Sequence, residues 1–243
     1  MILLKQNMLE AIERGDIYLS RKVSLDELNP NSINVSLGKI LKTYTPFKIK
    51  KTKKGLMFVK TKEIVLDVKK KNKVYEYEIP EEGVILSPDM FYLGNTIEEA
   101  GSDVYIPMYE GRSSLARLGL VSHLSAGFGD VGFKSQWTLE IAVQEPLKIY
   151  PRMRIGQVYF VSGSSQYPIY KYEGKYNGQN GPQESKMYLD YIKKDEEYIN
   201  ELEQDISVLK VKMMTATSDE VDIYREKIKE LNDEIIKLKK EVE

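Results

Sequence analysis

Residues 111–141 read GRSSLARLGLVSHLSAGFGDVGFKSQWTLEI, and this stretch carries the strongest signal in the chain. It opens with a Gly-Arg-Ser-Ser turn, which can offer backbone N–H groups, two hydroxyls and a guanidinium to phosphate oxygens. A four-residue motif alone is more often an ordinary polar turn. However, Arg117 follows among Leu115, Leu118 and Leu120, which look like core residues, and a charge there needs a partner or a task. The spacing beyond the turn therefore favours a functional site.

Two carboxylates follow in the same stretch. Asp130 lies in a glycine-rich corner, SAGFGDVGF, and Glu140 ends an apolar strand, WTLEI. Because strands alternate faces, Glu140 between Leu139 and Ile141 either points to solvent or faces a pocket. In a pocket it would activate a water molecule, with Arg117 nearby to tune its charge state.

Composition limits the chemistry that this chain can perform. It has no cysteine, which excludes disulfides, thiolate zinc sites and a cysteine nucleophile. The single histidine, His123, nearly excludes a zinc site built from nitrogen and sulfur ligands, and it stands beside apolar positions where we expect packing and hydrogen bonding.

Charge and hydropathy indicate the expected partners and cellular compartment of the protein. The formal net charge of -1 gives no global basic field, so we expect no nucleic-acid partner, and the lysine-rich run 48–54 reads as a solvated loop or hairpin. No apolar run is long enough to span a bilayer, and the N-terminal stretch is too charged for a signal peptide. We expect a soluble protein of the cytoplasm, of the host cytoplasm if the chain is viral.

The chain length of 243 residues and the hydrophobic content of 42% suit one large domain with an appendage. A short helix is expected near residues 2–12, ended by Gly15, and SINVSLG reads as a half-buried strand. Between residues 39 and 161 many short runs rich in β-branched and aromatic residues are separated by turns. This pattern predicts a mainly β barrel or sandwich.

The C-terminal third changes character twice. Residues 162–186 are rich in Gly, Ser, Tyr, Asn and Gln, which suits either a flexible linker or a segment that orders over a ligand. Beyond them, two helices with coiled-coil seams are expected, packed as a hairpin or on neighbouring subunits. Thr217 and Glu220 form a candidate capping box for the second helix. The seams are Ile199, Leu202, Ile206, Leu209 and Met213, then Tyr224, Ile228, Leu231, Ile235, Leu238 and Val242.

Five motifs in this order resemble those of the dCTP deaminase family, including its bifunctional dCTP deaminase–dUTPase members. They are EGRSSLARLGL (110–120), SHLSAGFGDVGF (122–133), TLE (138–140), PRMRIGQ (151–157) and KYNGQNGPQES (175–185). The first helix and the NPNSINVSLG strand also fit, so the resemblance covers roughly residues 1–188, with an apparent enlargement between 39 and 82.

The resemblance implies a dUTPase-like distorted β-barrel that forms a homotrimer with active sites at subunit interfaces. It implies a domain of residues 1–188, with a nucleotide lid at about 162–186. Residues 189–243 would then be a coiled-coil tail, which either strengthens the oligomer or binds a protein partner.

The resemblance also implies deamination of dCTP without zinc. Glu140 would be the general base for a water that attacks C4 of cytosine, and it would help to protonate the departing ammonia. Arg117 and Ser113 would orient this water and stabilise the developing charge. Asp130 would contact the sugar and, as in dUTPases, position a water for attack on phosphate.

The remaining implied contacts hold the nucleotide. The backbone at Ala126 would shape the base pocket, and Gln157 matches a family glutamine whose role is either structural or in binding. Mg²⁺ would bridge the triphosphate and not be held by a protein metal site. The phosphates would be bound by Arg112 and Ser114 and covered by Lys175, Tyr176 and Gln179.

Four positions depart from the family pattern without removing a proposed catalytic group: Asn34 for Asp, Gly129 for Ile, Val131 for Pro and Arg152 for Gly. We expect Gly129 to loosen the corner that presents Asp130.

Three functions stay open at this point. The first is deamination of dCTP to dUTP and ammonia, with or without hydrolysis of dUTP to dUMP and pyrophosphate. The second is a plain dUTPase, although Glu140 and Arg117 fit a deaminase better. The third is a nucleotide-binding regulatory protein whose helical tail binds a partner.

Overall fold

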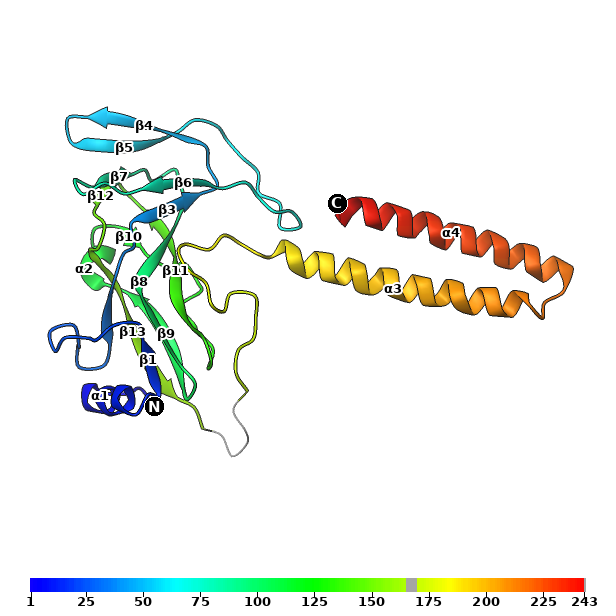
Figure 1. Ribbon diagram of the computed structural model, residues 1–243. Coiled ribbons are helices and arrows are strands. Elements are labelled where there is room, and N and C mark those ends of the chain that lie inside the picture. The colour runs from blue at the N-terminus through cyan, green and yellow to red at the C-terminus, as the bar shows by residue number, and fades with distance from the viewer. Residues whose placement is uncertain (165–169, 243) are drawn as a thin grey trace. The chain divides into compact units, whose positions relative to one another are not determined.

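The computed structural model describes residues 1–164 and 170–242 (Figure 1). The helices are α1 (Lys5–Glu13), α2 (Ser113–Ala116), α3 (Tyr188–Met213) and α4 (Ser218–Val242). The strands are β1 (Ile17–Leu19), β2 (Ile33–Ser36), β3 (Ile40–Thr43), β4 (Phe47–Thr52), β5 (Gly55–Lys60), β6 (Tyr75–Glu78), β7 (Val84–Leu86), β8 (Tyr92–Ser102), β9 (Tyr105–Gly111), β10 (Leu120–Val121), β11 (Lys134–Val143), β12 (Leu147–Ile149) and β13 (Arg154–Ser162).

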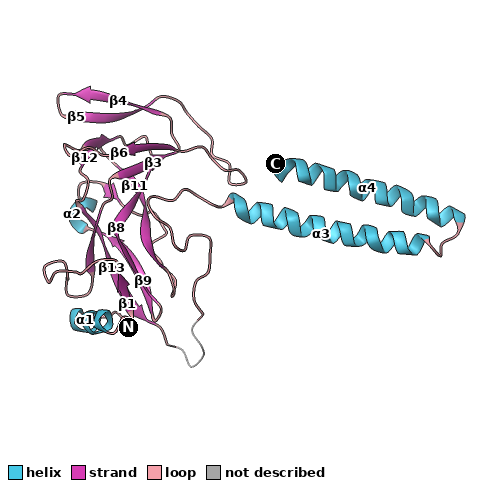
Figure 2. Cartoon of the chain, viewed as in Figure 1, coloured by secondary structure: helices cyan, strands magenta, loops and turns pink. Residues whose placement is uncertain are grey.

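The described strands form three sheets (Figure 2). The largest has the order β10-β11-β8-β3-β6, with β1 also paired to β8. The others have the orders β12-β7-β5-β4 and β2-β13-β9. The predicted mainly β core is confirmed, and within the described residues these ladders do not close into a single barrel.

Strand β11 explains how the sequence builds the core. Along β11, every second side chain is buried, among them Trp137, Leu139 and Ile141. Each fully buried side chain of this size stabilises the fold by about 1.5–3 kcal/mol. The alternate residues, Gln136, Thr138 and Glu140 among them, are only partly buried and leave one face of the strand available for chemistry.

The predicted first helix and its stop are confirmed, but the helix begins at Lys5, and Ile2 instead forms a β-bridge with Val161. Helix α1 buries Met8 and Ala11, and Gly15 ends it with a φ of 78°. Leu118, in contrast, was expected in the core but is 58% exposed. The reason is that Leu118 lies in the turn between α2, where Leu115 is half-buried, and β10, where Leu120 is buried.

The chain divides into two compact units, Met1–Val65 with Lys73–Glu184, and Leu66–Asn72 with Ser185–Glu243. The boundary expected between residues 188 and 189 stays a prediction. None of the helices within residues 1–164 and 170–242 combines the length and apolar character that a bilayer-spanning helix needs.

The second unit contains the helical hairpin. Ile199, Leu202 and Ile206 of α3 are buried against Ile235 of α4, which confirms that the two seams pack on each other. One half of the predicted capping box is also present, because the Thr217 N–H donates to Glu220 Oε2 at 2.9 Å, and the Thr217 hydroxyl donates to the same oxygen at 2.8 Å. Coiled-coil geometry and packing on neighbouring subunits stay predictions.

Arg152 occupies a backbone conformation that favours glycine. Its φ is 61°, and it stands where the family pattern has Gly. The turn is held by the Arg152 N–H bond to the Leu37 carbonyl and by the Leu37 N–H bond to the Met153 carbonyl. The Arg152 guanidinium pairs with Glu81, but both side chains are mostly exposed, so this pair contributes little.

We therefore expect Arg152→Gly to stabilise the protein by up to about 1 kcal/mol, because a left-handed L-residue costs more than the extra unfolded-state entropy of glycine. Urea unfolding would measure the change. The matched control is Arg154→Gly in strand β13, which should destabilise. A loss of stability in Arg152→Gly would show that the turn is not strained.

Candidate active site

Glu140 lies on the partly exposed face of β11, and two backbone amides fix its carboxylate. The Leu124 N–H donates to Glu140 Oε2 at 2.9 Å, and the Ser125 N–H approaches the same oxygen at 3.4 Å. Hydrogen bonds to a carboxylate are stronger than neutral ones, so they orient this group and tie the loop to the strand. Ala126 follows directly in that loop, which brings one predicted pocket residue beside the predicted base.

The Gly-Arg-Ser-Ser turn forms the start of helix α2. Arg112 is the N-cap residue in an extended conformation, and Ser113 and Ser114 begin the helix with exposed side chains. Arg117 caps the other end of α2 and is exposed. Within the described residues it forms no ion pair with Glu140 or with any other carboxylate. One chain therefore does not bring the predicted base and guanidinium together.

Gln157 lies next to the start of this turn, at the carbonyl of Gly111. Its Oε1 accepts a 2.6 Å hydrogen bond from the Ser32 hydroxyl, and the Asn29 amide lies 3.5 Å from the same oxygen. Its Nε2 is 3.4 Å from the carbonyl oxygen of Gly111, the residue before Arg112. Gln157 thus connects Ser32, directly before β2, to the start of the turn at Gly111. These contacts support a structural role for Gln157, one of the two roles expected from the sequence.

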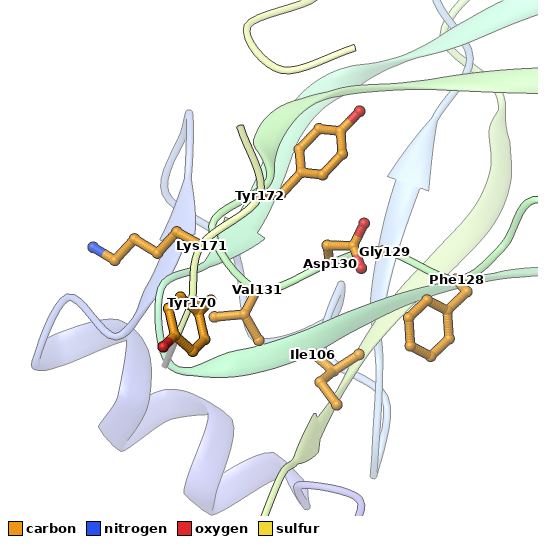
Figure 3. A pocket seen from close by; sticks show the side chains of 8 residues that line it. All are labelled: Ile106, Phe128, Gly129, Asp130, Val131, Tyr170, Lys171 and Tyr172. Carbon is orange, nitrogen blue, oxygen red and sulfur yellow. The ribbon is translucent and has the colours of Figure 1, made fainter. Parts of the chain in front are cut away.

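Asp130 borders an open pocket of about 410 Å³ (Figure 3). Figure 3 shows that one side comes from the glycine-rich corner and the other from residues 170–172. The two sides are joined by the Tyr172 N–H, which donates to the Val131 carbonyl at 2.7 Å. The lining residues are Ile106, Phe128, Gly129, Asp130, Val131, Tyr170, Lys171 and Tyr172.

Gly129 fixes this corner instead of loosening it, which corrects the expectation from the sequence. Its N–H donates to the Pro107 carbonyl at 2.9 Å. A Cβ at this position would lie 2.5 Å from the Trp137 ring and 2.8 Å from the Pro107 oxygen. A larger residue here would force the indole or the Pro107 backbone to shift, so glycine lets the two segments pack closely.

The predicted lid, residues 162–186, is only partly described, since residues 165–169 lie outside the described residues. Lys175 lies over the Tyr176 ring at 5.8 Å from its centroid. The Gln179 amide donates to the Gln136 carbonyl at 2.7 Å, which places this side chain on β11. The segment from 178 onward therefore lies along the strand that carries Glu140.

His123 packs beside the loop that holds Glu140. Its Nε2 is 3.2 Å from Glu110 Oε1, and its ring lies edge-on to Tyr109 with centroids 5.4 Å apart. The Tyr109 hydroxyl donates to the Ser122 oxygen at 2.9 Å, and burial raises the pKa of this phenol. These contacts agree with a packing and hydrogen-bonding role for His123.

Sequence reasoning missed the amides of Leu124 and Ser125, the Tyr109–Ser122 contact and the Asn29–Ser32 support of Gln157. Backbone donors leave no side-chain signature, and the Tyr109–Ser122 and Ser32–Gln157 contacts join residues that are 13 and 125 positions apart. The only sequence signal that could have drawn attention to Ser32 is the likeness of NPNSINVSLG to the corresponding family motif.

A protein-held metal site has no candidate in the part of the chain that the structure describes, since no three His, Cys, Asp or Glu side chains gather there. The expectation that Mg²⁺ enters with the nucleotide stays a prediction.

Comparisons with known proteins give consistent results. Residues 2–163 match the model of a family described as dCTP deaminase-like. A Clostridium acetobutylicum protein named "dCTP deaminase, dUMP-forming" is 44% identical over 166 residues, covering 68% of this chain and 86% of that protein. A Clostridium botulinum protein of the same name is 40% identical over 193 residues, covering 79% of this chain and 100% of that protein. A solved 2'-deoxycytidine 5'-triphosphate deaminase from Agrobacterium tumefaciens aligns with a TM-score of 0.48 and 14% identity, covering 67% of this chain and 48% of that one.

We expect Gln157→Leu to lower the free energy of unfolding by about 1–3 kcal/mol, because the hydroxyl of the buried Ser32 loses its acceptor. Chemical denaturation would measure this change. The control is Gln204→Leu on the exposed surface of α3, which should be nearly neutral. Equal stability of the two variants would contradict a supporting role for Gln157.

Proposed function

The chain belongs to the dCTP deaminase-like family, and we propose that it converts dCTP to dUMP by hydrolytic deamination followed by hydrolysis of dUTP. Deamination consumes one water and releases ammonia, and the second hydrolysis consumes another water and releases pyrophosphate. The observation that carries the first step is the Glu140 carboxylate, held by the backbone amides of Leu124 and Ser125 on the accessible face of β11. The relatives named "dUMP-forming" support the second step.

Glu140 would act as general base in the first step. Its carboxylate accepts a proton from water as the water oxygen bonds to C4 of cytosine. The same carboxyl group then gives a proton to the amino nitrogen, and the C4–N bond breaks to release ammonia. Proton transfer by a positioned group contributes about 10²–10⁴-fold in rate. The two amides leave Oε1 free of the hydrogen bonds that hold Oε2.

Arg117 and Ser113 would complete this site from a neighbouring subunit. Both side chains are exposed, and Arg117 has no described carboxylate partner within its own chain. A guanidinium and a hydroxyl presented outward on one helical turn suit an interface between copies, where they would stabilise charge on the attacked ring. A homotrimer with shared active sites would satisfy this requirement.

Nucleotide binding would use the rest of the predicted set. Arg112 and Ser114 would bind phosphates, and the Ala126 backbone would border the base next to Glu140. Mg²⁺ would enter with the triphosphate. Asp130, at its pocket with Tyr170 and Tyr172, would contact the sugar and position the water that attacks the α-phosphorus of dUTP, so that the bond to pyrophosphate breaks.

Neither alternative function has a supporting observation. A plain dUTPase does not need the ordered Glu140 carboxylate, and the relatives carry deaminase names. A purely regulatory nucleotide-binding protein does not need an ordered Glu140 carboxylate either.

Replacing Glu140 with Gln keeps the size of the side chain and removes the base. We expect ammonia release from dCTP to fall by at least about 10²-fold while dCTP binding stays within a few-fold. A coupled ammonia assay and calorimetry would measure the two quantities. Glu145→Gln, at an exposed carboxylate just beyond β11, is the control. If Glu140→Gln released ammonia at the full wild-type rate, the assignment of Glu140 as the general base would be refuted.

A substitution at Asp130 should separate the two proposed steps, deamination of dCTP and hydrolysis of dUTP. Wild-type protein should turn dCTP into dUMP, ammonia and pyrophosphate, and it should also hydrolyse added dUTP. Asp130→Asn should slow pyrophosphate release more than ammonia release, because Asp130 positions the water of the second step only. Chromatography of the nucleotides would follow both steps. If dUTP accumulated as the final product of the wild-type protein, the proposed deamination would stand and the proposed hydrolysis of dUTP would be refuted.

A further inference from the structure

Lys42 lies on the same face of the sheet as Glu140. In the register of the sheet, Lys42 of β3 is opposite Leu93 of β8, and Leu93 is opposite Glu140 of β11. Residues directly opposite each other on antiparallel strands point to the same face. With strands spaced by about 4.8 Å, two such steps put the Lys42 and Glu140 backbones about 10 Å apart.

The segment from residue 178 to residue 184, here called the strap, covers this face. The Gly181 N–H donates to the Gln136 side-chain oxygen at 2.6 Å, and the Gln183 N–H donates to the Thr138 hydroxyl at 3.0 Å. The strap therefore runs in the same direction as β11, and the next β11 residue on this face after Thr138 is Glu140.

Glu184 ends the strap at Lys42. The Lys42 Nζ and Glu184 Oε2 are 2.9 Å apart, and the two side chains are only 20% and 21% exposed. Most other ion pairs of the described residues are more exposed, for example Lys39–Glu78 at 59% and 61%. A partly desolvated pair contributes more than an exposed one, and removing one partner leaves a half-buried charge.

We propose that the Lys42–Glu184 ion pair anchors the strap on the Glu140 face of the sheet and thereby sets how tightly the nucleotide is held. Lys42 is a positioning residue, since it acts through the strap and not on the reacting atoms. The inference rests on the proposed deamination for its effect on the nucleotide, whereas the anchoring itself is independent of any activity.

Charge reversal of either partner tests the anchor. Lys42→Glu and Glu184→Lys should each speed chymotrypsin cleavage at Tyr176, two residues before the strap, by about tenfold, because the strap detaches more often. The KM for dCTP should rise by a similar factor while kcat changes little. The double variant K42E/E184K should restore both values towards those of the wild-type protein, because it remakes the pair with opposite polarity.

The control is Lys39→Glu, which breaks the exposed Lys39–Glu78 pair at the start of the same strand and should change neither readout. Unchanged cleavage in both single variants, or no recovery in the double variant, would refute the anchor. Faster cleavage with an unchanged KM would refute its role in holding the nucleotide. If the wild-type protein released no ammonia from dCTP, the proposed function would fail, and the cleavage rates would still decide the anchor.

Discussion

The hydrogen bonds from the Leu124 and Ser125 amides to the Glu140 carboxylate are the constraint on which the site depends. They join a loop to the accessible face of a strand whose other face, with Trp137 and Leu139, lies in the core. Because the buried face fixes the strand, the carboxylate has a defined position, and because the amides hold one oxygen, it has a defined orientation. A general base needs both properties before substrate arrives.

The surroundings of this carboxylate are built by contacts between distant parts of the chain. Gln157 connects Ser32 to the turn that begins at Gly111, and the strap brings residues 178–184 onto β11. Gly129 lets the backbone that carries Asp130 pass against Trp137. Each contact supports a different predicted subsite, so the functional residues rest on a shared scaffold although they do not all meet within one chain.

The separation of Arg117 from Glu140 has a simple physical meaning. A guanidinium left exposed on a four-residue helix costs nothing in a monomer, since water solvates it. In the proposed homotrimer, the same side chain would become useful when a second copy excludes that water. Glu140 and Arg117 would then be the two halves of one site, each incomplete within a single chain.

The sequence by itself determined the family, the mainly β core, the helical hairpin and the chemical types present at the site. These follow from local information: the order of motifs, the alternation along β11, the seams of Ile199 and Ile235, and the absence of cysteine. Only the tertiary structure decided that backbone amides hold Glu140, that Gln157 supports the turn, that Leu118 is exposed and that Lys42 meets Glu184. The physical reason is that a backbone N–H is the same in every residue, and a contact across 142 positions depends on the register of strands that no local pattern records.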